Sequence, residues 1–178
     1  MKNKPLSLLL LLVVFFMNWA IAQEYEQPDL EFVCELKVTT SDSFVVGNTP
    51  YGERRIIPIT GGTFKGPKLQ GTVLAGGADY QFVNAEDTRT EIEAIYSIKT
   101  DDGIFIHIRN EGVVYKDPAV AEQLKNGETI DWNRIYFRAA PKFNAPIDSP
   151  YNWMNNAIFV CKGVPTKEYV SIQVWKVL

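Results

Sequence analysis

The sequence predicts an all-β domain over residues 30–178, closed as a single antiparallel up-and-down-type β-barrel with one short helix. Apolar residues recur with a period of two rather than 3.6, most clearly in residues 30–38. Turn residues, mainly glycine, proline and aspartate, separate about nine short segments of this kind. Closure of consecutive antiparallel strands into a barrel removes unpaired edges, and a β-sandwich is the alternative fold.

The individual strands follow from alternation bounded by turn residues. The segment Asp101-Asp102-Gly103 carries an Asp-Gly turn between two alternating runs and predicts a hairpin. The glycines of residues 61–66 suit a tight corner or bulge, because Pro67 and a strand follow where a phosphate-binding loop would begin a helix. Strands are expected at residues 30–38, 54–60, 69–74, 79–83, 91–100, 104–110, 135–140, 157–162 and 169–177.

One helix is expected among the strands. Asp117 has the character of an N-cap, Pro118 suits the first helical position, and Gly127 can end the helix. Val120 and Leu124 give this helix only a narrow apolar stripe. We therefore expect the helix to lie over a barrel mouth or edge.

The first 22 residues have the pattern of a secretory signal peptide. Lys2 and Lys4 precede the apolar run 6–16, and Ala20-Ile21-Ala22 supplies the small-x-small cleavage pattern. We expect cleavage between Ala22 and Gln23, export to the periplasm or the medium, and no membrane contact afterwards. An uncleaved N-terminal anchor is the alternative. Residues 23–29 are expected to form a flexible segment before the barrel.

The net charge of the chain limits the classes of molecule that it can bind. The formal net charge is -3 at pH 7, whereas nucleic-acid binding requires clustered lysine and arginine. We therefore expect no nucleic-acid partner. Strand edges left over from barrel closure would permit a homo-oligomer.

The two cysteines, Cys34 and Cys161, each lie in an apolar strand-like run. An oxidising compartment would allow them to form a disulfide. Two buried free thiols acting as small apolar side chains explain the pattern equally well. Neither cysteine has a histidine in its neighbourhood, which argues against a catalytic thiol.

The chain has a single histidine, His107, and this excludes several mechanisms. A zinc site would need both cysteines and His107 to converge. A Ser-His-Asp triad would have to use His107 in the middle of a strand, and no serine lies in a Gly-x-Ser-x-Gly elbow. We therefore expect neither a metal nor a cofactor.

Five motifs follow one another in a distinctive order, at residues 52–71, 76–81, 136–138, 141–143 and 151–155. From about Leu30 to the C-terminus, this series resembles uncharacterised protein family 0311, also known as domain of unknown function 3237. The resemblance implies a compact antiparallel β-barrel and no particular reaction. The export signal and the two cysteines depart from the family pattern.

The motifs contain candidate ligand-binding residues. Asp79 and Gln81 share one strand face, and Tyr136 and Arg138 share another. Arg109 is the fifth candidate. Such groups around a mainly apolar interior would form a ligand pocket. An Asp–Arg pair that only fixes strand register is the alternative.

The segment Tyr151–Asn156 follows a proline-bounded loop and supplies two further candidates. Trp153 would cover the mouth of a cavity, and Asn155 would bind the ligand through hydrogen bonds. Alternatively, Trp153 fills the barrel end as part of the core.

Two functions follow from these residues. The first is a barrel that binds a small organic molecule in or at its mouth. The second is a cofactor-independent isomerase, cyclase or lyase. In the second, Asp79 would act as general base, Tyr136 would donate a proton, and Arg138 or Arg109 would stabilise an oxyanion.

Overall fold

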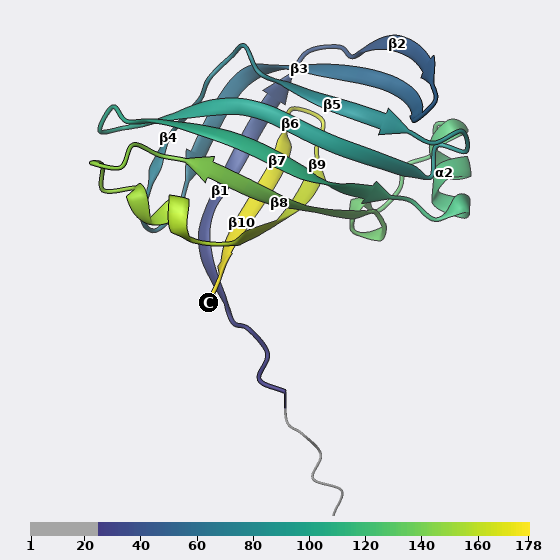
Figure 1. Ribbon diagram of the computed structural model, residues 1–178. Helices are drawn as coiled ribbons and strands as arrows, with labels where there is room; N and C mark the ends of the chain where they lie inside the picture. The colour runs from purple at the N-terminus through teal and green to yellow at the C-terminus, as the bar shows by residue number, and fades with distance from the viewer. Residues whose placement is uncertain (1–24) are drawn as a thin grey trace, which may run out of the picture.

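The computed structural model describes residues 25–178, and the signal segment expected at residues 1–22 lies outside them. Figure 1 shows one curved sheet with a short helix at one end. The helix α2 spans Pro118–Lys125, and the short 3₁₀ turns η1 and η2 span Trp132–Arg134 and Asn152–Asn156. The strands are β1 (Leu30–Thr40), β2 (Phe44–Thr49), β3 (Gly52–Lys65), β4 (Gln70–Val73), β5 (Ala78–Val83), β6 (Arg89–Thr100), β7 (Phe105–Tyr115), β8 (Tyr136–Asn144), β9 (Phe159–Pro165) and β10 (Val170–Val177).

The sheet closes into a barrel because β1 pairs with two strands, β10 on one side and β3 on the other. The remaining strands follow in the order β10, β9, β8, β7, β6, and all pairs are antiparallel. Strands β4 and β5 both lie between β3 and β6, so they share one position in the wall of an eight-stranded barrel. The predicted barrel is confirmed, and the alternative β-sandwich is wrong.

The long strand β3 bends at the glycine corner that the sequence predicts. Its pairing register with β1 shifts between Thr39 and Thr40, opposite the segment that holds Gly61 and Gly62. Gly62 has a φ of 134°, and a Cβ on it would lie 2.0 Å from the carbonyl oxygen of Lys37. The corner therefore requires glycine for both its backbone conformation and its close approach to β1.

One half of the barrel, which we call the sealed end, is filled with side chains. Met154 of η2 is fully buried there, and Phe143 and Phe159 meet edge to face with ring centroids 4.9 Å apart. These rings belong to the main core, whose fully buried aliphatic side chains include Leu36, Ile98, Ile106 and Ile108.

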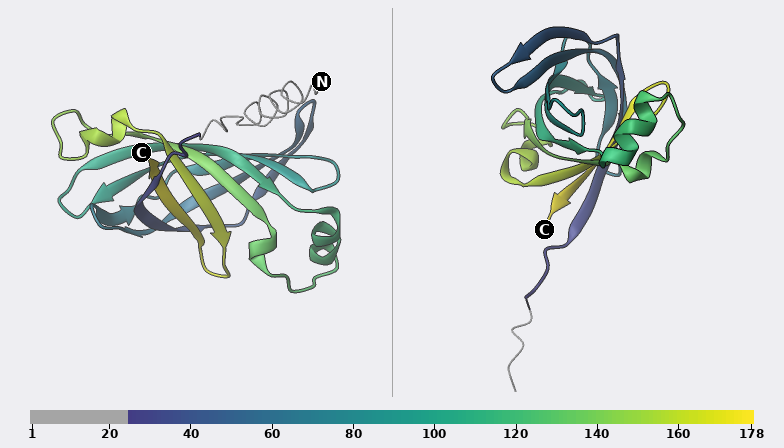
Figure 2. Two further views of the ribbon diagram at one scale, coloured as in Figure 1. Left: turned by 90° about the horizontal axis from the view of Figure 1, so that it is seen from below. Right: turned by 90° about the vertical axis from the view of Figure 1, so that its right-hand side faces the viewer.

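The opposite half, which we call the open end, carries α2. Figure 2 shows α2 and η1 together at one end of the barrel and η2 at the other. Asp117 caps α2 by accepting a hydrogen bond from the Val120 backbone N–H at 2.9 Å, as predicted. Val120 packs with Ile130 and Ile135 in a small cluster separate from the main core. None of the helices within residues 25–178 is long and apolar enough to cross a membrane.

All nine predicted strands are present, and the hairpin turn at residues 101–103 joins β6 to β7. Strand β2 is not among the predicted strands. Phe44, Val45 and Val46 are consecutive apolar residues and are all exposed. They therefore lack the alternation on which the strand predictions depend.

The two cysteines are free and buried, so the disulfide alternative is wrong. Cys34 pairs with Val174 of β10, and Val174 pairs with Cys161 of β9. The cysteines are thus two strands apart, about 9–10 Å at the usual strand spacing. A disulfide needs Cα atoms within about 7 Å.

Candidate functional site

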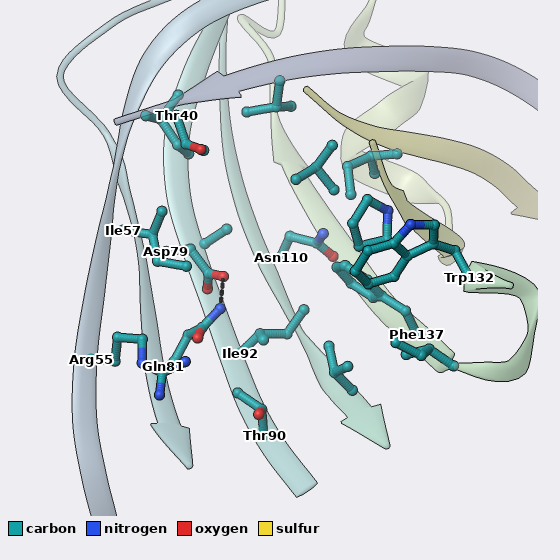
Figure 3. A pocket seen from close by; sticks show the side chains of 18 of the residues that line it. Thr40, Arg55, Ile57, Asp79, Gln81, Thr90, Ile92, Asn110, Trp132 and Phe137 are labelled. Atoms are coloured by element: carbon teal, nitrogen blue, oxygen red, sulfur yellow. Dashed lines mark hydrogen bonds between the residues drawn. The ribbon is translucent and has the colours of Figure 1, made fainter. Parts of the chain in front are cut away.

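The open end of the barrel contains a cavity of about 440 Å³ (Figure 3). Its bottom is formed by Tyr96 and Asn110, because the next inward side chains, Ile98 and Ile108, belong to the sealed core. Most of the wall is aliphatic or aromatic. The other lining residues are Val38, Thr40, Arg55, Ile57, Ile59, Asp79, Gln81, Thr90, Ile92, Ala94, Val114, Lys116, Leu124, Trp132, Ile135, Phe137, Pro165, Val170 and Ile172.

Asp79 and Gln81 supply the most polar part of the wall. Both side chains come from the inward face of β5, and their strand neighbours on β6 are the apolar Ala94 and Ile92. The Gln81 Nε2 group donates a hydrogen bond of 2.7 Å to Asp79 Oδ2, drawn as a dashed line in Figure 3. The other oxygen, Asp79 Oδ1, is buried and has no hydrogen-bond partner among residues 25–178.

Burial raises the pKa of Asp79 above the usual value of an aspartate. The hydrogen bond from Gln81 lowers the pKa and so offsets part of this rise, and the backbone N–H of Glu93 and the positive charge of Arg54 act in the same direction. A carboxyl group in an apolar wall with a raised pKa is better suited to exchange a proton near neutral pH than an exposed aspartate.

Tyr96 and Asn110 add two further hydrogen-bonding groups. Burial raises the pKa of Tyr96, so its hydroxyl keeps its proton at neutral pH and remains a hydrogen-bond donor. The Asn110 amide lies 3.6 Å from Cys161 Sγ, which makes this contact a weak hydrogen bond through sulfur. Burial raises the pKa of the Cys161 thiol to about 11, so it is not a nucleophile at neutral pH.

Two cationic residues line the cavity, and both have carboxylate partners. Arg55 Nη2 lies 2.9 Å from Glu53 Oε1. Lys116 Nζ lies 2.8 Å from Asp87 Oδ1. Each charge is therefore balanced within the protein before a ligand arrives.

The aromatic part of the wall comes from β8 and η1. Phe137 of β8 fits against Gly163 of β9, where an added Cβ would lie 2.3 Å from the Phe137 ring. Trp132 is held by the η1 turn, in which Asp131 Oδ1 accepts a hydrogen bond of 2.9 Å from the Asn133 backbone N–H. The glycine and the capped turn together position both rings at the cavity.

The structure brings two of the candidate residues, Asp79 and Gln81, together in the cavity. Tyr136, Arg138 and Arg109 are exposed on the outer face of the barrel. Arg138 lies over the Tyr136 ring at 5.3 Å. The structure therefore does not bring Tyr136 or these arginines to the cavity beside Asp79.

Arg109 forms ion pairs outside the barrel, with Glu93 at 2.7 Å and Glu111 at 2.9 Å. The pair with Glu93 joins the neighbouring strands β6 and β7 on the outer surface, whereas the pair with Glu111 lies within β7. Exposed pairs of this kind contribute little to stability.

Trp153 and Asn155 lie at the sealed end, away from the cavity. The Trp153 ring packs against Phe159 with centroids 5.9 Å apart. The Asn155 side chain accepts a hydrogen bond from the Ala145 backbone N–H and donates one to the Ala145 carbonyl, both at 2.9 Å. Trp153 therefore packs against the core, and Asn155 fastens η2 to the end of β8.

Several polar and aromatic residues of the cavity were not among the candidates from the sequence. Tyr96 continues the alternation of Ile92 and Ile98 on β6, which would have identified it as inward-facing. Asn110 likewise continues the alternation of Ile106 and Ile108 on β7. Trp132 carries no comparable signal in the sequence. The residues missed are Thr40, Arg55, Thr90, Tyr96, Asn110, Lys116, Trp132 and Phe137.

The described residues 25–178 hold no cluster of three or more histidine, cysteine, aspartate or glutamate side chains that would bind a metal ion. What the cavity offers instead is one carboxyl, one phenol, two amides, two threonine hydroxyls and two cations paired to carboxylates, within mostly apolar walls. This set can bind an organic molecule through hydrogen bonds and apolar contact, and it can exchange protons.

Comparison with known proteins places the chain in a family. The UPF0311 protein of Clostridium acetobutylicum is 35% identical over 85% of this chain and 96% of its own length. A solved structure of a protein of unknown function from Rhodopseudomonas palustris is 33% identical and superimposes with a TM-score of 0.77, covering 87% of this chain and all of that one. A β-barrel-like protein from Acinetobacter baumannii is 30% identical over 88% of this chain and 99% of its own, with a TM-score of 0.75.

The family model for a protein of unknown function, DUF3237, matches residues 28–177, which include the entire barrel and every residue of the cavity. The matches cover nearly the whole length of these relatives. The chain therefore belongs to the DUF3237 family, as the sequence motifs predict.

Proposed function

We propose that this protein binds a small, mainly apolar organic molecule in the open end of its barrel. The observation that carries the proposal is the cavity of about 440 Å³, which lies within the usual range of ligand sites. Its walls are mostly aliphatic and aromatic and hold a few polar groups, the usual composition of such a site.

The unpartnered oxygen of Asp79 supports the same proposal. A buried carboxylate oxygen without a hydrogen bond is unfavourable in the empty protein. A ligand that donates a hydrogen bond to this oxygen would supply the missing partner. The site thus has both a volume to fill and a polar group to satisfy.

The proposal is tested by screening metabolite pools against residues 23–178 by thermal shift and native mass spectrometry. A second sample carries Ala94→Phe, which places a phenyl ring in the cavity from a half-buried position on its wall. A matched control carries Ala140→Phe at an exposed position on β8. We expect ligands that bind the wild type and Ala140→Phe and lose at least about tenfold in affinity with Ala94→Phe.

The proposal fails if no compound binds the wild type. It also fails if Ala94→Phe and Ala140→Phe bind every identified compound as the wild type does, because the binding site would then lie outside the cavity.

A second candidate function is cofactor-independent proton transfer. It is favoured by one specific observation, the presence of two ionisable groups, Asp79 and Tyr96, in the same apolar cavity. Asp79 would accept a proton from a bound substrate, and the Tyr96 hydroxyl would donate a hydrogen bond to the negative charge that develops. Tyr96 is then the phenol of the site in place of Tyr136.

Proton transfer is tested with any ligand found in the screen, incubated with the protein in D₂O. We expect the wild type to introduce carbon-bound deuterium, and Asp79→Asn and Tyr96→Phe to lose that exchange by at least about a hundredfold. Binding of the ligand without exchange in the wild type would leave a binding protein and exclude this second function.

We also propose that the protein is exported. The basic, apolar and small-residue segments of residues 1–22 support this. Intact-mass analysis of periplasmic and medium fractions should show a chain that begins at Gln23. A full-length chain in either the cytoplasm or the membrane would contradict cleavage.

A further inference from the structure

The cavity has two unlike walls on different sides of the barrel. Asp79 and Gln81 project from β5, and Phe137 projects from β8. Strands β6 and β7 lie between them, so the two walls are three positions apart in a barrel of eight. Figure 3 accordingly shows the Asp79–Gln81 pair of β5 and the rings of Trp132 and Phe137, from η1 and β8, facing the same space.

Trp132 presents an aromatic surface to the cavity. The residue is 41% exposed, yet its side chain lines the cavity, so part of the indole faces the cavity and part faces solvent. The η1 turn behind it is tied to β9, because Lys162 Nζ donates a hydrogen bond of 3.3 Å to Asn133 Oδ1. An aromatic ligand stacked on a fixed ring gains an interaction that a saturated ligand of the same size lacks.

The opposite wall calls for a hydrogen-bond donor. Gln81 occupies Asp79 Oδ2, which leaves Oδ1 without a partner. An ionised carboxylate only accepts hydrogen bonds, so an O–H or N–H of the ligand satisfies it and an ether oxygen does not.

The cations of the cavity argue against an anionic ligand. Arg55 and Lys116 already pair with Glu53 and Asp87. An anion would have to displace one of these carboxylates to gain a charged partner, and it would meet the Asp79 carboxyl inside.

From these contacts we infer that the ligand is a planar aromatic molecule without negative charge, which stacks on Trp132 and donates an O–H or N–H hydrogen bond to Asp79. This inference rests on the proposed binding function and specifies the chemical class of ligand. Trp132 then sets the preference for a flat ring, and Asp79 sets the preference for a donor.

The test uses three probes of the same two-ring skeleton, measured by isothermal titration calorimetry on residues 23–178. The probe 2-naphthol has a flat ring and a donor, 2-methoxynaphthalene lacks the donor, and decahydro-2-naphthol lacks the flat ring. We expect 2-naphthol to bind the wild type about tenfold more tightly than either of the others.

Two variants test which residue causes the preference for a flat ring and which causes the preference for a hydrogen-bond donor. Trp132→Leu should weaken binding of 2-naphthol about tenfold and leave decahydro-2-naphthol within about twofold. Asp79→Asn should bring 2-naphthol and 2-methoxynaphthalene to similar affinities. Trp175→Leu is the control for loss of an indole, since Trp175 packs against Phe32 away from the cavity and should leave all three affinities unchanged.

Equal affinity of the wild type for 2-naphthol and decahydro-2-naphthol overturns the inference, as does unchanged 2-naphthol binding by Trp132→Leu. If none of the three probes binds while a saturated compound from the metabolite screen does, the inference is wrong and the proposed binding function stands. If neither experiment yields a ligand, both are wrong.

Discussion

At the scale of single residues, the cavity keeps a group that is unfavourable in the empty protein. Asp79 is placed among aliphatic neighbours, and Gln81 satisfies only one of its two oxygens. Groups of this kind are often retained at functional sites at the expense of stability. Their effect on stability can be measured without knowing the ligand.

We predict that Asp79→Asn stabilises the empty protein at neutral pH. Because burial raises the pKa of Asp79, the folded state binds this proton more tightly than the unfolded state does. The stability of the wild type therefore falls as pH rises from the usual aspartate pKa through the raised one, and the variant escapes this loss. Urea denaturation from pH 3.5 to pH 8 should show the advantage of the variant appearing across that window and vanishing at the acid end.

Asp42→Asn, at an exposed position, is the control and should show no such pH-dependent gain. A constant difference between Asp79→Asn and the wild type at every pH would show that the ionisation of Asp79 is not its cause.

The two thiols give a second prediction at this scale. Burial raises the pKa of Cys34 to about 12 and that of Cys161 to about 11, so little thiolate forms at pH 8. The native protein should resist iodoacetamide at pH 8, and both cysteines should react after denaturation without reductant, as measured by intact mass. A denatured chain that takes up no label before reduction would show a disulfide and contradict the structure.

At the scale of strands, alternation shows which residues share a face but not which face is inside. On β5 the polar Asp79 and Gln81 face inward while Tyr80 and Phe82 face outward, the reverse of the usual pattern. On β8 the inward side chains include Phe137, so the polar pair chosen from the sequence lies outside. Most of the strands were thus predictable, whereas the inward face of β8, and so its contribution to the pocket, was not.

Irregular segments carry still less information about the site. Trp132 reaches the cavity from the connection between α2 and β8, where no periodicity applies. Its position depends on a capped turn and on a contact with β9, which are both tertiary features. By contrast, the helix cap at Asp117 was predictable because capping depends only on nearby residues.

The fit between β8 and β9 gives a prediction at the scale of elements. Gly163→Ala places a Cβ 2.3 Å from the Phe137 ring, so the ring must move toward the cavity or the strands must separate. We expect a loss of about 2 kcal/mol in the free energy of unfolding and weaker ligand binding. Urea denaturation measures the first effect and calorimetry the second.

The double variant Gly163→Ala with Phe137→Leu is the matched control, because the smaller side chain leaves room for the added methyl group. We expect the double variant to lose less free energy of unfolding than the two single variants lose together. Strict additivity would show that the ring does not cause the loss.

At the scale of the whole molecule, one barrel contains a filled half and a hollow half, and the same substitution should cost less in the hollow half. Ile106 is fully buried in the sealed end, whereas Ile92 lines the cavity. We expect Ile106→Ala to lower the free energy of unfolding by about 4 kcal/mol and Ile92→Ala by about 2 kcal/mol, because part of Ile92 has no packed neighbour to lose.

The effect of the two substitutions on ligand affinity should be in the opposite order to their effect on stability. Ile92→Ala alters the cavity wall and should change the affinity, whereas Ile106→Ala should leave it within about twofold. Equal losses of stability, together with equal changes in affinity, would mean that the two halves do not differ as the structure shows.

Strands β1 and β10 are neighbours, with Leu30 opposite Val177, and the Leu178 backbone N–H donates a hydrogen bond of 2.9 Å to the Asp29 carbonyl. Both strands have these ends on the sealed side and their other ends at the cavity. Anything fused before Leu30 or after Val177, whether an affinity tag, a surface linker or a membrane anchor, therefore holds the barrel by its closed side. The cavity mouth then points away from the support, and ligands reach it unobstructed.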